Sequence, residues 1–456
     1  MILKLTDGSQ TIDLAGTSPV VACTYFPLEP TERSTRTPRA RDDGENVSSL
    51  SYANVVEPVS IILEGTSSSI LTWYHSVVAM LQAGRSGLSD VYVQYDPYSS
   101  DSVHRAKIIT GRPSWPKAPL RRYLPSSGTT TVQVDFNWER DPVWEGDEVE
   151  ARITATNQSA ALGGVNVYNH VASGKGNWFQ IASSQILGEL PAPVRLEIVN
   201  STGAPQFFRN FYFGNFPFIS GSTLPSLFIQ GEEARSGLGT IISLSSCSGG
   251  QYIQKILTGT GLLTWDLSST VLQQTLGRRY KIFMRTPGYS GTAYITPQIR
   301  DVDGLTILWE GDEILLPNPQ KELIDLGRAV PLPPSGSGSW AGSTFVLYIR
   351  TSGSSTVNVD YLAFLPTESY RHLVQRATEV DTDAYIVDDS IRNRAWWQSS
   401  ADNLAYDVFR VDQSKLVVYP GLSNRIFTLH DDTTGSSTPA DLVRIRLFYR
   451  PRRLVV

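Results

Sequence analysis

The sequence predicts a mainly β protein of 456 residues, with an N-terminal sheet domain that carries one helix, a jelly-roll β-sandwich and a small C-terminal β region. Three observations predict this class. Glycine and proline are abundant, with 36 and 27 residues, and both are typical of turns between strands. Aromatic residues reach 10% and charged residues only 18%, where about a quarter is usual. Most of the chain carries short apolar runs, and a single segment carries a convincing helical period.

The first predicted domain, residues 1–148, opens with a hairpin. Alternating runs at Ile2–Leu5 and Thr11–Leu14 flank the dipeptide Asp7-Gly8, which is typical of a tight turn. A polar stretch, Pro30–Ser49, follows. It holds too few apolar side chains to pack on its own, so we expect an extended loop with four arginines, Arg33, Arg36, Arg39 and Arg41.

One helix is predicted after a buried strand at Val59–Leu63. Thr66 or Ser67 can cap its N-terminus, and Gly84 can end it. Apolar side chains recur every three or four residues between these positions, as in an amphipathic helix: Ile70, Trp73, Tyr74, Val77, Val78 and Leu81. This apolar stripe needs a sheet to cover, and three further strands follow at Val91–Tyr95, Arg105–Thr110 and Thr130–Trp138. The domain is therefore expected to be a small sheet or split barrel with one helix.

The second predicted domain, residues 149–367, contains strand-length runs separated by Gly, Ser, Asn and Pro. Strands about ten residues apart, several of them alternating, indicate a β-sandwich of jelly-roll type. Two flexible segments interrupt it, near Ser243–Gly250 and at Pro331–Ser343. The runs are Val194–Val199, Phe207–Phe213, Tyr280–Arg285, Ala293–Ile299, Thr306–Trp309, Phe345–Ile349 and Val357–Phe364.

The third region, residues 368–456, is predicted to begin with a short helix at Glu368–Ala377. Its clearest strand is Leu442–Tyr449, in which Val443, Ile445, Leu447 and Tyr449 alternate with arginines. This region either completes the sandwich or returns to the first domain, and the sequence leaves both arrangements open.

Charge and composition exclude several classes of protein. A formal charge of −5 and a pI near 5.7 argue against nucleic-acid binding, which calls for a basic surface. Apolar stretches are well short of 18 residues, so no membrane insertion is expected. The first residues lack a basic segment followed by a long apolar core, so we expect folding in a cytoplasm. Cys23 and Cys247 are interpreted as inert thiols, with a disulfide between them left open.

Candidate catalytic groups do not form a recognisable constellation. The histidines are scattered singly, without metal-ligand spacing: His75, His104, His170, His372 and His430. Carboxylates cluster at Asp301 and Asp303, at Glu310, Asp312 and Glu313, and at Asp388 and Asp389, and solvated turns explain them more simply than a glycosidase pair. The run Asp301–Gly304 resembles the start of a calcium loop but lacks its distal glutamate. We expect no enzyme, no cofactor and no metal site.

Aromatic side chains in the sandwich raise a second hypothesis, glycan binding. Exposed Trp and Tyr rings can stack on the C–H faces of sugars. Trp340 is the strongest candidate because it lies in a Ser-Gly-rich loop, and Trp265 and Tyr289 are further candidates, although most such rings are simply core.

The first domain resembles a known family. The runs Glu57–Gly65, Gly87–Tyr95 and Val132–Arg140, followed by Asp141–Gly146 with its Pro-x-Trp-Glu-Gly pattern, resemble distal tail and minor tail proteins of siphophages and prophages. The resemblance implies a tail-tube-like β-barrel or sheet, flanked by a helix, that assembles into a ring. The strand Val357–Leu365 is similar to the accessory carbohydrate-binding-like jelly rolls of such proteins. The length of the middle region departs from their usual two-domain layout.

This resemblance implies a structural protein at the distal end of a virion tail, made in a bacterial cytoplasm. Its expected partners are copies of itself in a ring, a hexamer in preference to a trimer, together with the tail tube protein, tail tip or baseplate hub proteins and a host surface glycan. Unpaired strand edges suit such assembly. The arginines of Pro30–Ser49 are candidates for pairing with an acidic surface of a neighbouring subunit, and a solvated loop is the alternative. The alternative function is a stand-alone glycan-binding β-sandwich.

Overall fold

The architecture is that of a computed structural model, and it is mainly β, as predicted. In the described ranges α1 is the one α-helix, and it lies in the N-terminal part of the chain. The structure describes residues 2–38, 45–97, 103–114, 130–169, 171, 175–200, 206–207, 210–222, 227–235, 237–267, 278–316, 323–332, 342–375, 379–380, 384–398, 405–406, 409–411, 415–431 and 442–456.

The chain divides into two compact units. Unit 1 comprises Met1–Val149, Leu187–Leu190 and Arg450–Val456, and unit 2 comprises Glu150–Ile186 and Pro191–Tyr449. Residues from far along the chain therefore complete the first unit: β39 (Arg452–Arg453) pairs antiparallel with β10 (Trp144–Glu145). The domain boundaries at residues 148 and 367 stay a prediction.

Unit 1 is built on an antiparallel sheet with the strand order β2-β1-β7-β8-β9-β6-β3. The sheet is open, because its end strands β2 and β3 do not pair with each other among the described residues. Its strands are β1 (Ile2–Thr6), β2 (Thr11–Asp13), β3 (Val20–Thr24), β6 (Val55–Gly65), β7 (Tyr92–Asp96), β8 (His104–Ser114) and β9 (Thr130–Arg140). The predicted hairpin is confirmed, since Leu5 of β1 lies opposite Ile12 of β2.

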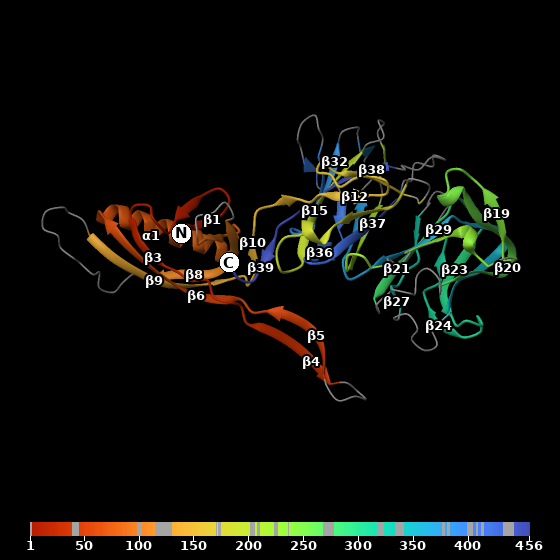
Figure 1. Cartoon of the computed structure of the whole chain (residues 1–456), viewed down its shortest axis with the longest axis horizontal. Helices are drawn as coiled ribbons and strands as arrows, with labels where there is room; N and C mark the ends of the chain where they lie inside the picture. Colours follow the sequence, from red (N-terminus) through yellow and green to blue (C-terminus); the bar gives the residue numbers. More distant parts are fainter. Residues whose placement is uncertain are drawn as a thin grey trace. The chain divides into compact units, whose positions relative to one another are not determined.

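Helix α1 (Ser67–Arg85) covers one face of this sheet (Figure 1). Thr66 is its N-cap, with the hydroxyl oxygen accepting a hydrogen bond from the Ser69 amide, as the sequence predicts. The buried stripe is Ile70, Trp73, Val77, Met80 and Leu81. It packs on apolar side chains of the strands, and these side chains form the core of unit 1.

The expectation of an extended loop at Pro30–Ser49 is wrong. The segment forms a hairpin of β4 (Glu32–Pro38) and β5 (Glu45–Tyr52), a two-stranded sheet that pairs with no other described strand (Figure 1). Backbone hydrogen bonds between strands need no apolar side chains, so a polar sequence rich in Thr and Ser can form a ladder without a core of its own.

Unit 2 contains two β-sandwiches, one inserted in the sequence of the other. The flanking sandwich uses strands before and after the insertion: β12 (Ile153–Ala155), β13 (Val165–Tyr168), β14 (Trp178–Ile181), β15 (Ala192–Asn200), β17 (Asn210–Phe218), β30 (Tyr370–Gln375), β32 (Tyr385–Asp389), β33 (Arg394–Gln398), β34 (Ala405–Tyr406), β35 (Phe409–Val411), β36 (Val417–Val418), β37 (Ser423–Asp431) and β38 (Leu442–Tyr449). β11 (Val149–Glu150) also pairs with β38, and β16 (Gln206–Phe207) pairs with β31 (Glu379–Val380). Short 3-10 turns lie at η1 (Ser183–Gln185), η2 (Gly231–Glu233) and η3 (Ser248–Gly250).

The flanking sandwich has one sheet ordered β11-β38-β15-β32-β33-β34 and another ordered β12-β14-β37-β17-β30-β35. The alternation predicted for Leu442–Tyr449 is confirmed, since Val443, Ile445 and Leu447 are fully buried. The helix predicted at Glu368–Ala377 is wrong. Tyr370–Gln375 is strand β30, held between β17 and β35, so pairing on both sides outweighs the local helical pattern.

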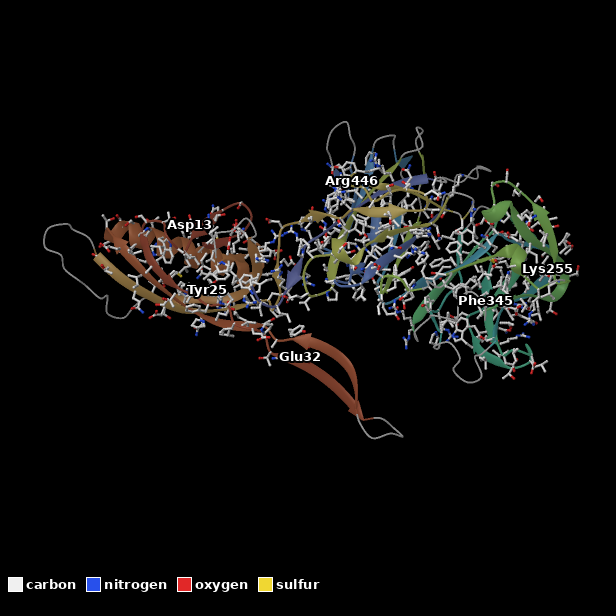
Figure 2. The ribbon with its side chains drawn as sticks, in the orientation of Figure 1. Asp13, Tyr25, Glu32, Lys255, Phe345 and Arg446 are labelled. Carbon is white, nitrogen blue, oxygen red and sulfur yellow. The ribbon has the colours of Figure 1, made fainter. Side chains whose placement is uncertain are left out.

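The inserted sandwich pairs a sheet ordered β18-β29-β21-β26 with a second sheet ordered β19-β20-β28-β23-β24. Its strands are β18 (Phe228–Gln230), β19 (Thr240–Ser243), β20 (Gln251–Asp266), β21 (Arg279–Arg285), β22 (Tyr289–Ser290), β23 (Ala293–Arg300), β24 (Ile307–Glu310), β25 (Ile314–Leu315), β26 (Leu323–Asp325), β27 (Val330–Pro331), β28 (Thr344–Val359) and β29 (Tyr361–Pro366). Phe345, labelled in Figure 2, belongs to the second of these sheets. Its ring contacts that of Phe364 in the other sheet edge to face, with ring centroids 5.7 Å apart. The two sheets therefore share one core.

Among the described residues, no helix is both long and apolar enough to cross a membrane. Cys23 and Cys247 do not form a disulfide with each other. Burial raises the pKa of the Cys23 thiol to about 11, which keeps it protonated and poorly nucleophilic at neutral pH.

Candidate interaction surface of unit 1

The sheet of unit 1 has one covered face and one open face. Along β6, Val55, Val59, Ile61 and Leu63 are buried, and the residues between them point the other way. β9 shows the same alternation. On the open face Val56 is 57% exposed and Ile62 38% exposed, next to half-buried or exposed polar side chains of β9. A strip of apolar and polar side chains without a covering layer is therefore available to a partner.

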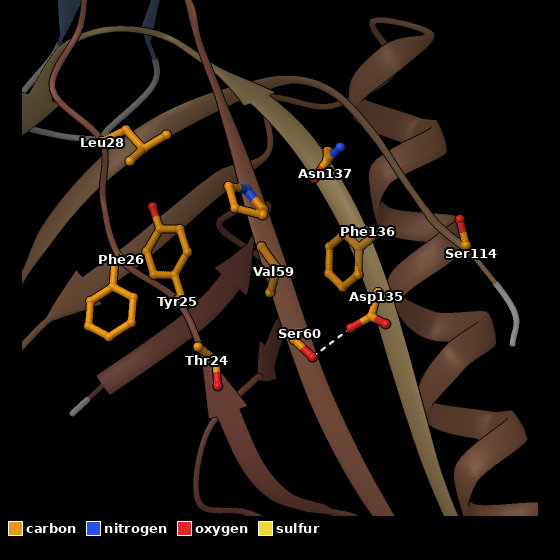
Figure 3. Close-up of a pocket in the computed structure, with 11 residues that line it drawn as sticks. Thr24, Tyr25, Phe26, Leu28, Val59, Ser60, Ser114, Asp135, Phe136 and Asn137 are labelled. Carbon is orange, nitrogen blue, oxygen red and sulfur yellow. Dashed lines mark hydrogen bonds between the residues drawn. The ribbon is translucent and has the colours of Figure 1, made fainter. Parts of the chain in front are cut away.

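A shallow cavity of about 550 Å³ lies on this open face, beside edge strand β3. It is lined by Thr24, Tyr25, Phe26, Leu28, Pro58, Val59, Ser60, Ser114, Asp135, Phe136 and Asn137 (Figure 3). The segment that follows β3 forms one wall, and β6 and β9 form the floor.

Two apolar side chains on that wall are exposed. Phe26 is 73% exposed and Leu28 45% exposed. A single exposed apolar residue is common on protein surfaces, whereas two beside a cavity, an uncovered sheet face and an edge strand form a coherent surface. We use the name "Phe26 surface" for the residues that line this cavity, which include Phe26 and Leu28.

A buried polar cluster beneath the Phe26 surface holds its wall in place. The Glu57 carboxylate accepts hydrogen bonds from the Tyr25 hydroxyl at 2.5 Å, the Leu28 amide at 2.8 Å and the Trp138 indole N–H at 3.0 Å. Arg140 completes the cluster, with a guanidinium nitrogen 2.7 Å from the Glu57 carboxylate and both side chains fully buried. We call these four residues and the Leu28 backbone the Glu57 cluster.

Arg140 links the cluster to further backbone. It donates to the carbonyl oxygens of Leu28 at 2.9 Å and Asp141 at 2.8 Å, and its guanidinium lies 4.5 Å from the Trp144 ring centroid. Burial, together with the neighbouring Glu57 carboxylate, raises the pKa of Tyr25 far above its ordinary value. Tyr25 therefore stays a neutral hydrogen-bond donor, and a charged pair with satisfied hydrogen bonds fixes the segment that presents Phe26.

A second, exposed network lies on the floor of the cavity. The Ser60 hydroxyl donates to Asp135 at 2.5 Å (Figure 3). The Gln133 amide donates to both of these side chains. The hydrogen bond from Ser60 and that from Gln133 lower the pKa of Asp135. Asp135 therefore presents a carboxylate with acceptor capacity to any group that enters the cavity.

The arginines predicted as interface residues lie only partly within the described structure. Arg33 is exposed on β4, and Arg36 lies on the same strand. Arg39 and Arg41 lie outside the described residues. The structure thus places the first two on a hairpin rather than on a loop, and their role at an interface stays a prediction.

Two of the three predicted glycan-stacking residues, Trp265 and Tyr289, lie in the described part of the chain. Trp265 is fully buried, and its indole N–H donates to the carbonyl oxygens of Gln230 and Gly231 at 3.2 Å. Its ring therefore offers no face to a sugar. The prediction for Trp265 is wrong because its side chain points to the side of β20 that faces the core. Tyr289 is half-buried against the same core. Trp340 lies outside the described residues.

Six of the seven clustered carboxylates, all but Asp303, have structural partners among the described residues. Asp388 pairs with Arg371, Glu313 with Arg350 and Asp312 with Arg328. Asp301 accepts the backbone amides of Leu305 and Thr306, which closes its turn, and Glu310 accepts a hydrogen bond from Gln298. Among the described residues, no group of three metal-binding side chains gathers.

The sequence analysis missed Phe26 and the Glu57 cluster. A usable pattern was present: Glu57 and Arg140 occupy buried-phase positions of alternating strands, where a charge is retained only with a partner. Two opposite charges in such positions on separate strands predict that the strands are neighbours, as β6 and β9 are.

No protein-family model matches the chain, and no curated protein matches it. Its structure is similar to that of the Dit protein of phage SPP1, described as a paradigm of the hub adsorption apparatus in phages infecting Gram-positive bacteria, with 9% identity, 99% of both chains covered and a TM-score of 0.34. A phage P2 baseplate structure matches at 8% identity, covering 100% of this chain and 99% of the other, with a TM-score of 0.33.

The tandem CBM22 domain of Xyn10C from Paenibacillus barcinonensis matches at 11% identity, covering 54% of this chain and 98% of the other, with a TM-score of 0.19. TM-scores this low leave the function to be argued from the residues of the chain itself.

Proposed function

We propose that the protein is a non-enzymatic structural subunit of a phage or prophage tail, in which copies of unit 1 form a closed ring at the distal end of the tail tube. The ring connects the tube to tip or baseplate hub proteins, and the β-sandwiches of unit 2 contact a host surface glycan or other tip proteins. A hexamer is favoured over a trimer. The subunit is made in the bacterial cytoplasm and resides in the virion.

The Phe26 surface carries this proposal. A fully buried Arg–Glu pair with satisfied hydrogen bonds is costly to build, and here it holds Tyr25 and Leu28, the residues on either side of the exposed Phe26 ring. Rigid, exposed aromatic side chains are frequent anchors of protein interfaces. The adjacent edge strand β3 also leaves backbone groups unpaired on its outer side in the described sheet, and a neighbouring subunit can complete it.

A heterologous interface fits this surface. Rings arise when one patch of a subunit binds a different patch of the next copy and the rotation closes. The Phe26 surface is one such patch, and the hairpin β4–β5, which pairs with no other described strand, supplies a second region of unit 1 able to contact a neighbour. The absence of enzymatic activity is part of the proposal and is consistent with carboxylates engaged in structural pairs.

Light scattering coupled to size exclusion tests the ring on the whole chain, with negative-stain electron microscopy of the peak fraction. We expect a closed ring of six subunits. Phe26→Ser should shift the protein to monomer with unchanged thermal stability, because Phe26 is already exposed to solvent. Leu88→Ser is the matched control, since Leu88 is 83% exposed in unit 1 and does not line the cavity.

A monomer at all concentrations, or a ring that survives Phe26→Ser unchanged, would contradict assembly through this surface. A stable monomer would instead favour the alternative function, a glycan-binding sandwich protein that acts without assembly.

A further inference from the structure

The inserted sandwich has an outer sheet face that its core does not use. Along β28 the side chains of Phe345, Leu347 and Ile349 enter the core, so Thr344, Val346 and Tyr348 lie on the opposite face. The register aligns this face across three strands, with Thr264 of β20 and Gln298 of β23 opposite Val346. We call it the outer face.

A cavity of about 270 Å³ lies on the outer face, lined by Arg235, Leu238, Leu262, Thr264, Arg300, Gly304, Thr344 and Val346. Its character is mixed. Leucine and valine side chains supply apolar walls, and two arginines and two threonines supply hydrogen-bond donors. Such a combination of apolar surface with a few convergent polar groups is typical of small-ligand sites.

The charges of the cavity do not balance. Arg235 pairs with the Asp266 carboxylate through one terminal nitrogen at 2.7 Å and through Nε at 3.0 Å, and its other terminal nitrogen makes no bond within the described residues. Arg300 bonds only neutral oxygens there, the Gln298 side-chain carbonyl at 2.7 Å and the Gly304 carbonyl at 3.2 Å. One positive charge is therefore uncompensated, which favours an anionic ligand.

Thr344 supplies an independent observation. It is fully buried, and its hydroxyl has no hydrogen-bond partner in the described part of the chain, although it lines the cavity. A buried hydroxyl without a partner is costly unless a ligand or water satisfies it. Thr264, which is also buried, lines the same cavity.

The remaining outer face suits a sugar ring. Leu262 lies opposite Tyr348, which is half-buried, so an aliphatic side chain and an aromatic ring adjoin the arginines and the two hydroxyls. Aromatic and aliphatic surfaces pack on sugar C–H groups, and hydroxyl and guanidinium donors bind their oxygens. A purely inorganic anion would leave these apolar surfaces without a contact.

We infer that this cavity binds an acidic saccharide, with its anionic group against Arg235 and Arg300 and its ring over the partly exposed Leu262, within reach of Tyr348. The inference deepens the glycan contact in the proposed function and assigns it to residues other than the predicted Trp265, Tyr289 and Trp340. Carboxylate-bearing and phosphate-bearing sugars share the required chemistry.

Isothermal titration calorimetry on the full chain tests the inference with four probes: trigalacturonate, glucose 6-phosphate, neutral maltotriose and inorganic phosphate. At least one acidic sugar should bind more tightly than both maltotriose and phosphate. Arg235→Gln and Arg300→Gln should each weaken it about tenfold or more, from the loss of a charge-assisted hydrogen bond. Arg328→Gln is the control, because Arg328 lies in the same sandwich, is exposed and pairs with Asp312 outside the cavity.

Thr344→Val separates binding from folding. It removes the unpartnered hydroxyl, so the saccharide should bind more weakly while thermal stability holds or rises. The inference is overturned if no acidic sugar binds, if maltotriose or phosphate binds equally well, or if the two arginine variants bind like the unmodified chain. Light scattering of the same variants distinguishes a failure of the saccharide inference from a failure of the ring proposal. The cavity variants should assemble normally, and Phe26→Ser should still bind the sugar.

Discussion

The two units each bury an arginine–carboxylate pair, and the pairs serve different ends. In unit 1, Arg140 and Glu57 stabilise a segment that reaches the surface at Leu28. In unit 2, a guanidinium nitrogen of Arg371 in β30 lies 2.6 Å from a carboxylate oxygen of Asp388 in β32. This pair joins the two facing sheets of the flanking sandwich, and Asn393 also accepts a hydrogen bond from Arg371. Burial raises the pKa of Asp388 to about 6, against the opposing influence of Arg371.

The difference lies in what the remaining hydrogen bonds reach. The Glu57 carboxylate accepts hydrogen bonds from the Tyr25 hydroxyl and from the backbone amide of Leu28, a residue that is exposed to solvent. The Asp388 carboxylate instead accepts its hydrogen bonds from Arg371, inside the sandwich. The same kind of pair therefore fixes the Leu28 segment at the surface of unit 1 and joins two sheets of the core in unit 2. Loss of the first pair should affect assembly as well as stability, and loss of the second should affect stability alone.

The largest expected effect is that of Arg371→Leu. It leaves the Asp388 carboxylate buried without its partner, which should cost about 3–5 kcal/mol of unfolding free energy, measured by urea denaturation. Adding Asp388→Leu should recover much of the loss, because no charge is then left unpaired. The control Arg392→Met removes an exposed arginine from Asp389 and should change stability by less than about 1 kcal/mol. A similar small effect of Arg371→Leu would refute a structural role for the pair.

Glu57→Gln should have an intermediate effect on stability and a strong effect on assembly. Glutamine keeps the shape but weakens the charge-assisted hydrogen bonds to Arg140 and Tyr25, which should cost about 2–3 kcal/mol. The Leu28 segment should loosen, and light scattering should show weaker assembly. Glu139→Gln, on the open face beside Asn54, is the control and should leave both measurements nearly unchanged. Normal assembly by a destabilised Glu57→Gln chain would separate the cluster from the Phe26 surface.

The smallest effect concerns a half-exposed pair in unit 2. Hydrogen bonds from Arg446 lower the pKa of Glu150, so this carboxylate stabilises the fold above its unfolded pKa of about 4.3 and loses that contribution as pH falls through the lower folded pKa. Glu150→Gln should therefore cost about 0.5–1 kcal/mol at pH 7, and its difference from the unmodified chain should shrink in denaturation series as the pH falls below about 4.3. A difference that grows on acidification would reverse the assigned sign.

Much of the fold could be predicted because local pattern and tertiary packing agree. The α1 stripe and the buried alternation of Val443, Ile445 and Leu447 follow directly from periodicity. The predictions that proved wrong concern segments in which the local sequence pattern and the tertiary packing favour different structures. The hairpin β4–β5 forms from a polar sequence, because its two strands pair through their backbones. Strand β30 pairs with β17 and β35, and the helical propensity of its own residues gives no information about these neighbours.

The candidate sites were less accessible to prediction. Phe26 is an ordinary residue in sequence, and only the Glu57 cluster beneath it gives it a fixed position. Arg235 and Arg300 lie 65 positions apart and meet at one cavity only because β20, β28 and β23 align. Trp265 was predicted to bind a sugar because it is aromatic, yet its side chain is buried in the core, so residue type alone did not identify a binding site.

The pairing of β39 with β10 has a consequence for biosynthesis. Arg452 and Arg453 are translated after the whole of unit 2, yet they complete the sheet that begins with the first strand. A ribosome-bound or prematurely terminated chain therefore carries an unfinished first unit. Unit 1 can therefore complete its sheet only after the residues of unit 2 have been synthesised, and a truncation before Arg452 leaves that sheet without β39.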